Sequence, residues 1–332
     1  MTDLIVQQIG KAGNITLNRP QALNALTWDM CLAIEATLEK WRDDDSVGLV
    51  MIDGAGDRAF CSGGDIADMY ASGQNGDLDY GRRFWRDEYR LNSKIAHYPK
   101  PIVTFLHGFT MGGGVGIGCH ASHRIVCENS QVALPECAIG LVPDVGGSYL
   151  LARAPGLTGT YLGLTGARMD AGDAIYAQFA DHFVPQAQWP ALCNALATHG
   201  IAAIPDHPAP DAQLEALQND IAASYCGSTL ADILGNPQTG LHKAVHRNAP
   251  LAMACAMVLI DNARQHQDLN TALAQEFRFT ARAVAQSDFI EGIRAAIIDK
   301  DRNPKWQTIT DAKVATMLAP LGDDIGALEK EN

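Results

Sequence analysis

The chain has 332 residues, 47% of them hydrophobic and 19% charged, a composition typical of a globular protein. Its formal net charge of −13 argues against nucleic acid and anionic membranes as partners, because both would repel it. No apolar stretch approaches a membrane span, and the eight cysteines form no C-x-x-C pair. With an acidic amino terminus and no leader-like region, this composition predicts a cytoplasmic protein.

Strand and helix patterns alternate along the first 185 residues. The predicted strands are Leu4–Ile9, Asn14–Asn18, Val47–Asp53, Pro101–His107, Arg124–Cys127 and Gln131–Leu134. The predicted helices begin after a capping residue at Thr27, cover about Ile66–Ala71, and run from about Tyr80 to Ala96. Strands that alternate with helices predict an α/β domain.

A different pattern follows the Pro-rich stretch Ile204–Pro210, which is typical of a linker. The remaining segments have helical periodicity. They are Asp211–Ser224, Leu251–Arg264, Leu269–Gln286 and Asp288–Ile298. We therefore expect an α/β core over residues 1–200 and a helical carboxy-terminal region over residues 211–332.

Two predicted strands each run into a glycine-rich loop, Gly54–Gly64 and Gly108–Gly114. Glycine lets the backbone approach a ligand closely, and a following helix adds partial positive charge. Two such loops could direct separate N–H donors at one oxygen, as an oxyanion hole requires, or could simply be tight turns. A nucleotide site is disfavoured, because the glycines fit neither a P-loop nor a G-x-G-x-x-G register.

Two acids, Glu136 and Asp144, lie in a mostly apolar segment that ends at Gly147. Burial raises a carboxylate's pKa, and a second carboxylate nearby raises it further, which makes both residues candidates for a general base or nucleophile. The alternative is that they are solvated loop acids or helix caps. Read alone, Asp144 is better explained as a cap for the helix expected to begin at Gly146.

Cysteines 119 and 127, with His120 and His123 between them, invite a comparison with zinc sites. The histidines would share a helix face only if a helix continued through Arg124, where a strand is expected to begin. The stretch has neither C-x-x-C nor H-E-x-x-H spacing. We therefore expect no metal.

Three stretches together resemble the crotonase (enoyl-CoA hydratase/isomerase) superfamily. They are Ala59–Ile66, His107–Gly114 and Pro135–Gly147. The resemblance spans nearly the whole chain and implies a spiral of β-β-α units followed by a helical carboxy-terminal region. It also implies an oxyanion hole formed by the N–H groups of Gly64 and Gly113. The first loop, with Ser62, Asp65 and Ile66, would bind the CoA part of an acyl-CoA substrate, and no separate cofactor is expected.

The branch of the superfamily follows from the acids. Hydratases use two glutamates, one matching Glu136 and the other falling at Gly116, where this chain has no carboxylate. The chain has Asp144 instead, and it resembles the 3-hydroxyisobutyryl-CoA hydrolase branch, in which Glu88, Gly113, Glu136 and Asp144 would contact the substrate. Further matching stretches are Glu88–Asn92, Glu276–Arg278, Asp288–Ala295 and Asp299–Trp306.

The resemblance therefore predicts hydrolysis of a short β-hydroxyacyl-CoA thioester in valine breakdown. Glu136 would attack the carbonyl or activate a water, and the sequence leaves both routes open. An enoyl-CoA hydratase or isomerase of the same superfamily is one alternative, and a non-catalytic CoA-ester binding protein is another. The helical carboxy-terminal half is also a candidate for self-association into a homo-oligomer, as helical tails are in this superfamily.

Overall fold

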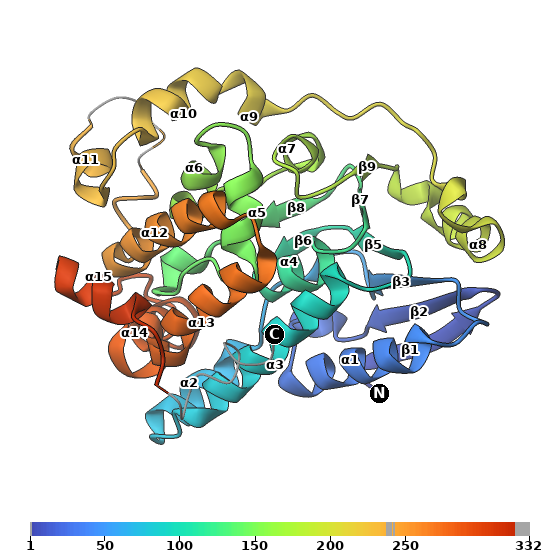
Figure 1. Ribbon diagram of the computed structural model, residues 1–332, viewed down its shortest axis with the longest axis horizontal. Helices are drawn as coiled ribbons and strands as arrows, with labels where there is room; N and C mark the ends of the chain where they lie inside the picture. Colours follow the sequence, from blue (N-terminus) through green and yellow to red (C-terminus); the bar gives the residue numbers. More distant parts are fainter. Residues whose placement is uncertain (1, 237–240, 242, 323–332) are drawn as a thin grey trace. The chain divides into compact units, whose positions relative to one another are not determined.

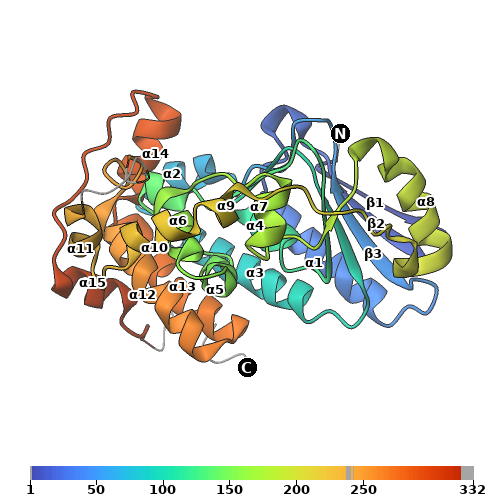
Figure 2. The same ribbon diagram turned by 90° about the horizontal axis from the view of Figure 1, so that it is seen from above.

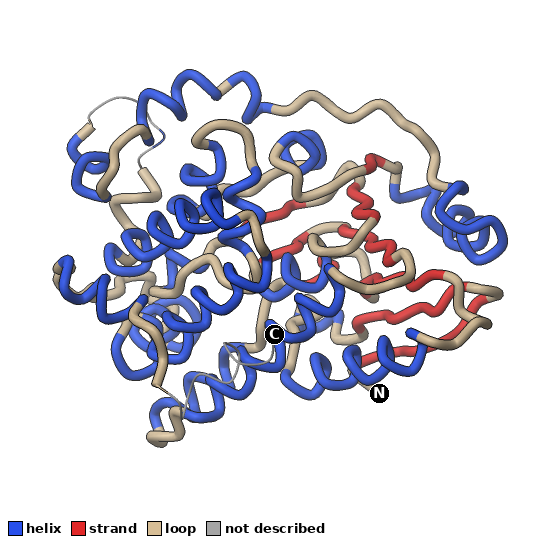
Figure 3. Tube along the Cα trace, viewed as in Figure 1, coloured by secondary structure: helices blue, strands red, loops and turns tan. Residues whose placement is uncertain are grey.

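A computed structural model describes residues 2–236, 241 and 243–322 (Figure 1). The chain divides into two compact units. Unit 1 comprises Met1–Gly64, Arg90–Ala133 and Arg168–Glu215, and unit 2 comprises Asp65–Tyr89, Leu134–Ala167 and Ala216–Asn332. Within the described ranges, every strand belongs to unit 1, whereas unit 2 is helical (Figure 3). The predicted α/β class with a helical carboxy-terminal region is confirmed, and the predicted boundary between residues 200 and 211 stays a prediction.

Unit 1 is built on a six-stranded sheet with the order β1-β2-β3-β5-β7-β9. Only the β1–β2 hairpin is antiparallel; the other pairs are parallel. The strands are β1 (Leu4–Ile9), β2 (Ala12–Leu17), β3 (Leu49–Gly54), β5 (Ile102–Leu106), β7 (His123–Val126) and β9 (His182–Phe183). The helices are η1 (Pro20–Ala22), α1 (Trp28–Arg42), α4 (Gly113–Gly118), α7 (Ala171–Tyr176), η3 (Gln186–Gln188), α8 (Trp189–His199), η4 (Gly200–Ala203) and α9 (Gln213–Ala216), together with the end of α3 (Asp79–Ala96).

Helices α1 and α8 cover opposite faces of this sheet, since adjacent residues of a strand point to opposite sides. On one face, a Cβ atom at Gly13 would lie 2.6 Å from the Trp41 ring of α1, so glycine is needed for this close packing. On the other face, Ala12 belongs to an apolar cluster that includes Trp189 and Leu196 of α8. Figure 2 shows α8 lying along the strands of this sheet. The Thr27 side chain accepts a hydrogen bond from the Met30 amide, which confirms the predicted cap of α1.

A second, three-stranded parallel sheet has the order β4-β6-β8. Its strands are β4 (Ala59–Cys61), β6 (Phe109–Met111) and β8 (Gln131–Ala133). The first two lie inside the stretches that we expected to be glycine-rich loops. The third, β8, falls within the predicted strand Gln131–Leu134. The other two are short and have glycines on both sides, so only their pairing with distant segments reveals them.

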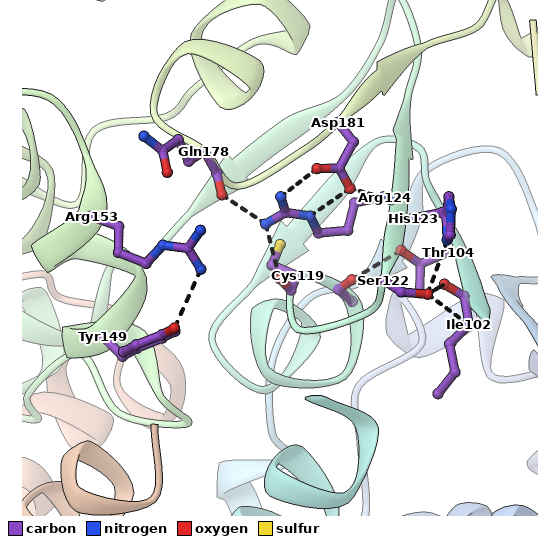
Figure 4. A network of polar contacts seen from close by, with 11 residues as sticks. Ile102, Thr104, Cys119, Ser122, His123, Arg124, Tyr149, Arg153, Gln178 and Asp181 are labelled. Carbon is purple, nitrogen blue, oxygen red and sulfur yellow. Dashed lines mark hydrogen bonds and ion pairs between the residues drawn. The ribbon is translucent and has the colours of Figure 1, made fainter. Parts of the chain in front are cut away.

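Arg124 of β7 joins this strand to the segment that precedes β9 (Figure 4). Its guanidinium donates to both carboxylate oxygens of Asp181, at 2.8 and 2.5 Å, and to the Gln178 carbonyl oxygen at 2.7 Å. Ser122, two residues earlier in the chain, bonds the backbone of Ile102 through its hydroxyl. This network ties the chain between α7 and β9 to the parallel sheet, and we assign it a structural role.

Glycine is required where α4 meets β4. A Cβ atom at Gly114 would lie 2.4 Å from the carbonyl oxygen of Cys61, and that backbone atom cannot turn away as a side chain could. We expect Gly114→Ala to lower the free energy of unfolding by about 1–3 kcal/mol, the usual cost of overpacking. Urea denaturation measures this. Gly235→Ala is the matched control, because among the described residues a Cβ atom there would meet nothing within 4 Å beyond its own helix and chain neighbours. Equal stability of the two variants would contradict the expected strain at Gly114.

Unit 2 consists of helices packed around α12, which contacts α5, α6, α13 and α15. They are α2 (Ile66–Gln74), the start of α3, η2 (Glu136–Ile139), α5 (Gly147–Arg153), α6 (Thr158–Thr165), α10 (Gln218–Tyr225), α11 (Leu230–Gly235), α12 (Pro250–His266), α13 (Leu269–Gln286), α14 (Phe289–Ile293), a π-helical turn (Arg294–Ile298) and α15 (Asp311–Leu318). The predicted helix Leu269–Gln286 is confirmed. The one predicted over Asp211–Ser224 is divided between α9 and α10, and Asp288–Ile298 combines α14 with the π-helical turn.

Candidate active site

Glu136 begins the 3-10 helix η2 in unit 2 and is 5% exposed. The helix ends at Gly140, whose φ of 78° is left-handed and therefore suits glycine. A Cβ atom at Gly140 would lie 2.5 Å from the Asp288 backbone, and one at Gly292 would lie 2.1 Å from the Ile139 carbonyl oxygen. Close packing against Asp288 and against Gly292 of α14 therefore supports the turn that carries Glu136.

Asp144 is 4% exposed and accepts a 2.7 Å hydrogen bond from the hydroxyl of Tyr89. The sequence taken alone favoured a solvated or capping role for this residue, and that expectation is wrong. The N-cap residue of α5 is Gly146 rather than Asp144, and glycine has no side chain with which to cap the helix. Asp144 is instead a buried carboxylate held by a buried phenol.

Glu88 lies beside Tyr89 on α3 and is 3% exposed. Burial, and then the charge of Asp144, raise its pKa well above the ordinary value. The structure therefore brings three predicted site residues, Glu88, Glu136 and Asp144, into one group of interacting acids within unit 2. All three are buried, and the charged neighbours that shift the pKa values of Glu88 and Glu136 are other acids.

The electrostatics of this group favour the protonated forms. Burial raises the pKa of Glu136 well above its ordinary value, and the neighbouring carboxylates, Asp144 first, raise it further. Burial raises the pKa of Asp144 to about 7, although the hydrogen bond from Tyr89 opposes this. Since these groups interact, their protons are lost in steps that belong to the whole group. Such acids can take up or release a proton near neutral pH.

Two carboxylate oxygens in the group have no protein partner. Among the described residues, Glu88 Oε1 and Glu136 Oε2 are buried and accept no hydrogen bond. Buried polar atoms are usually satisfied, so each exception needs an explanation. A carboxylate oxygen left unpaired by the protein is available to a substrate or to a water molecule.

Glu276 of α13 is a fourth acid of this group, and we did not single it out from the sequence. It is fully buried and accepts hydrogen bonds from the amides of Gly146 and Ser148 and from the Ser148 hydroxyl. Burial raises its pKa to about 8, against the effect of those bonds. The motif Glu276–Arg278 was part of the family resemblance, but nothing in the local pattern indicates which residues it contacts.

The predicted oxyanion donors lie in unit 1, where their two loops meet. Gly63 has a φ of 115°, and a Cβ atom there would lie 3.3 Å from the Met111 carbonyl oxygen. Gly64, the next residue, pairs with Leu26 in an isolated bridge. Gly113 is the first residue of α4, a position whose N–H has no acceptor within a helix. Each loop therefore has the tight glycine geometry expected of it, and the donor role stays a prediction.

The remaining predicted binding residues lie at the end of the first loop. The Ser62 amide donates a 3.0 Å hydrogen bond to the Leu23 carbonyl oxygen. Asp65 is at the N-cap position of α2 but makes no capping bond, and Ile66 begins that helix. All three side chains are partly exposed. Their role in binding CoA stays a prediction.

Gly116 is fully enclosed in α4, a helix that carries only apolar residues and glycine. This position therefore supplies no second carboxylate for paired acid–base hydration.

Within residues 2–236, 241 and 243–322, no cluster of three or more His, Cys, Asp or Glu is arranged to hold a metal. Over the same residues, no helix combines the length and apolarity that crossing a membrane requires.

Residues 12–319 match the family model described as enoyl-CoA hydratase/isomerase. The chain belongs to the enoyl-CoA hydratase/isomerase family. The predicted crotonase resemblance is thereby confirmed. A relative in this family from Danio rerio, named "3-hydroxyisobutyryl-CoA hydrolase, mitochondrial", is 36% identical over 334 residues, which cover 95% of this chain and 87% of the relative.

Two solved structures of family members are similar over almost their whole length. One, named as an enoyl-CoA hydratase from Rhodobacter sphaeroides 2.4.1, has a TM-score of 0.93 and 52% identity, covering 96% of this chain and 98% of that one. The other, named as a carnitinyl-CoA dehydratase from Mycobacterium thermoresistibile, has a TM-score of 0.92 and 38% identity, covering 97% and 98%. They confirm the expected crotonase fold.

Proposed function

We propose that this protein hydrolyses 3-hydroxyisobutyryl-CoA to 3-hydroxyisobutyrate and CoA, a thioesterase step of valine breakdown. The observation that carries the proposal is the pairing of Glu136 with Asp144 in one group of buried, interacting acids. Gly116 supplies no second glutamate for hydration. The name of the Danio rerio relative supports the same reaction and the same acyl group.

Glu136 is the reacting carboxylate in this proposal. Its unpaired Oε2 either attacks the thioester carbon or removes a proton from a water that attacks it. The carbon–sulfur bond then breaks, and the CoA thiolate takes up a proton. In the first route a water molecule then cleaves the mixed anhydride. Both routes release a carboxylic acid and free CoA, and both use water as the only co-substrate.

The other predicted residues have supporting roles. The N–H groups of Gly64 and Gly113 donate to the thioester oxygen as negative charge develops there. Asp144 holds the β-hydroxyl of the acyl group or orients the attacking water. Glu88, with an unpaired buried oxygen, also contacts the substrate. Ser62, Asp65 and Ile66 bind the CoA part, and no separate cofactor takes part.

Heavy oxygen found in Glu136 after a single turnover in heavy-oxygen water would establish direct attack. If Glu136 attacks directly, hydrolysis of the anhydride at the enzyme carboxyl carbon leaves heavy oxygen in Glu136. If water attacks, the label enters only the released acid. Mass spectrometry of the peptide that contains Glu136 reads the difference.

An enoyl-CoA hydratase is the second candidate, favoured by the name of the Rhodobacter sphaeroides protein, which is 52% identical. Two assays on the same preparation separate the candidates: thiol release from 3-hydroxyisobutyryl-CoA, and hydration of crotonyl-CoA. We expect thiol release without hydration, because hydration lacks its second acid at Gly116. Hydration without thiol release would establish the second candidate, and neither activity would favour a CoA-ester binding protein.

The cellular setting is proposed from the sequence alone. We place the protein in the cytoplasm, whereas the Danio rerio relative is named as mitochondrial. Self-association through the helical carboxy-terminal half is also proposed. Cell fractionation and the molar mass in solution are the measurements that test these two points.

A further inference from the structure

Glu276 lies at the centre of the hydrogen bonds that follow Asp144 in the chain. Its Oε2 accepts from the Gly146 amide at 2.7 Å, and its Oε1 accepts from the Ser148 amide at 2.9 Å and from the Ser148 hydroxyl. All three donors lie within four residues of Asp144. A single buried side chain of α13 therefore fixes the backbone that leaves Asp144.

That backbone has an uncommon conformation. Val145 and Gly146 have φ angles of 56° and 76°, both in the left-handed region, and the Gly147 amide closes the turn on the Asp144 carbonyl oxygen at 2.7 Å. A β-branched residue such as valine is rarely left-handed and needs surrounding structure to hold it there. The hydrogen bonds to Glu276 stabilise this backbone conformation, because they fix Gly146 and Ser148 on the carboxy-terminal side of Val145.

A second connection from α13 reaches the Asp144 side chain. Thr280 is four residues after Glu276 and so lies on the same face of the helix. The Tyr89 hydroxyl lies 3.3 Å from Thr280 Oγ1 and 2.7 Å from Asp144 Oδ2. Tyr89 and Thr280 are both buried. Helix α13 therefore holds Asp144 twice, through its backbone and through its carboxylate.

We propose that Glu276 and Thr280 are positioning residues, which set the place of the Asp144 carboxylate for the reaction. This inference rests on the proposed function for its kinetic consequence. Glu276 is not itself a candidate for the chemistry, because both of its oxygens already accept hydrogen bonds, unlike Oε2 of Glu136.

Glu276→Gln tests the proposal with little change of shape. Whichever way the amide is turned, a nitrogen replaces one accepting oxygen opposite a backbone N–H. We expect kcat for thiol release to fall by about 10- to 100-fold with KM little changed, from the loss of a charged hydrogen bond. A crystal structure of the variant should show the Asp144 carboxylate displaced from the Tyr89 hydroxyl.

Thr280→Val should lower kcat in the same way. Thr280→Ser keeps the hydroxyl group, so its kcat should remain close to that of the wild type.

A double variant separates positioning from general damage. If Glu276 acts through Asp144, adding Glu276→Gln to Asp144→Asn costs no further activity, whereas independent effects would multiply. Gln275→Leu is the control on the same helix, because that side chain bonds Asn262 rather than a member of the acid group, and its kcat should equal that of the wild type. The proposal would be overturned if the kcat losses of the two single variants multiplied in the double variant. It would also be overturned if Asp144 kept its bond to Tyr89 in the structure of the Glu276→Gln variant. If the wild type releases no thiol, the proposed function fails, and the crystal structures still decide the positioning.

Discussion

Glu136→Gln is expected to reduce thioester hydrolysis by about 10²–10⁴-fold in kcat, the range that a general base usually contributes, or by more if the carboxylate attacks directly. Glutamine has nearly the same shape but can neither take up the proton of a water nor attack the carbonyl. Because the shape of the site is kept, substrate binding should be largely preserved. KM should therefore change little, as steady-state thiol release will show.

Glu215→Gln is the matched control for this prediction, since Glu215 is an exposed acid of the short helix α9. It should keep the wild-type kcat. Binding of a non-hydrolysable CoA thioether to the Glu136 variant, measured by calorimetry, will show that the protein still binds its ligand. If Glu136→Gln turned over substrate at close to the wild-type rate, Glu136 could not be the reacting group.

Much of the fold follows from patterns that a single segment carries by itself. Leu269–Gln286 was predicted to the residue, because its apolar periodicity is long and Asp268 caps it by accepting from the Thr271 amide. Strands β4 and β6 were missed for the opposite reason. Each has three residues, and only their parallel pairing with each other and with β8 makes them strands. Long local patterns are readable from the sequence, whereas short strands depend on distant partners.

Some residues of the site can likewise be predicted from the local sequence, whereas others depend on distant partners. Glu136 could be predicted because an acid within an apolar segment is chemically unusual wherever it lies. Asp144 could be selected only through the family resemblance, because the partner that makes it a buried acid is Tyr89, 55 residues away. Glu276 is 130 residues from the Gly146 amide that it accepts from. No local pattern links residues so far apart, so their roles emerge only from the folded chain.

The acid group also has an energetic consequence. The four carboxylates of the acid group are buried, and burial raises the pKa of each. A carboxyl group whose pKa is raised by folding makes the protein less stable as the pH rises through that pKa, because the unfolded chain releases the proton more readily. The group therefore lowers stability near neutral pH, where its members lose their protons. Acids with strongly shifted pKa values are typical of active sites, where the reaction requires them despite their cost in stability.

Asp144→Asn should change both the rate and its dependence on pH. Loss of the carboxylate is expected to lower kcat/KM by about 10- to 100-fold, as for a lost hydrogen bond to a charged group. Activity requires ionised Glu136, whose pKa the Asp144 charge raises, so the rate should fall below that raised pKa. Removing the charge lowers the pKa of Glu136, although burial still keeps it above the ordinary value. The acid limb of the kcat/KM profile should therefore move to lower pH in the variant. An unmoved limb would mean that Asp144 is uncharged or electrostatically uncoupled from the group that reacts.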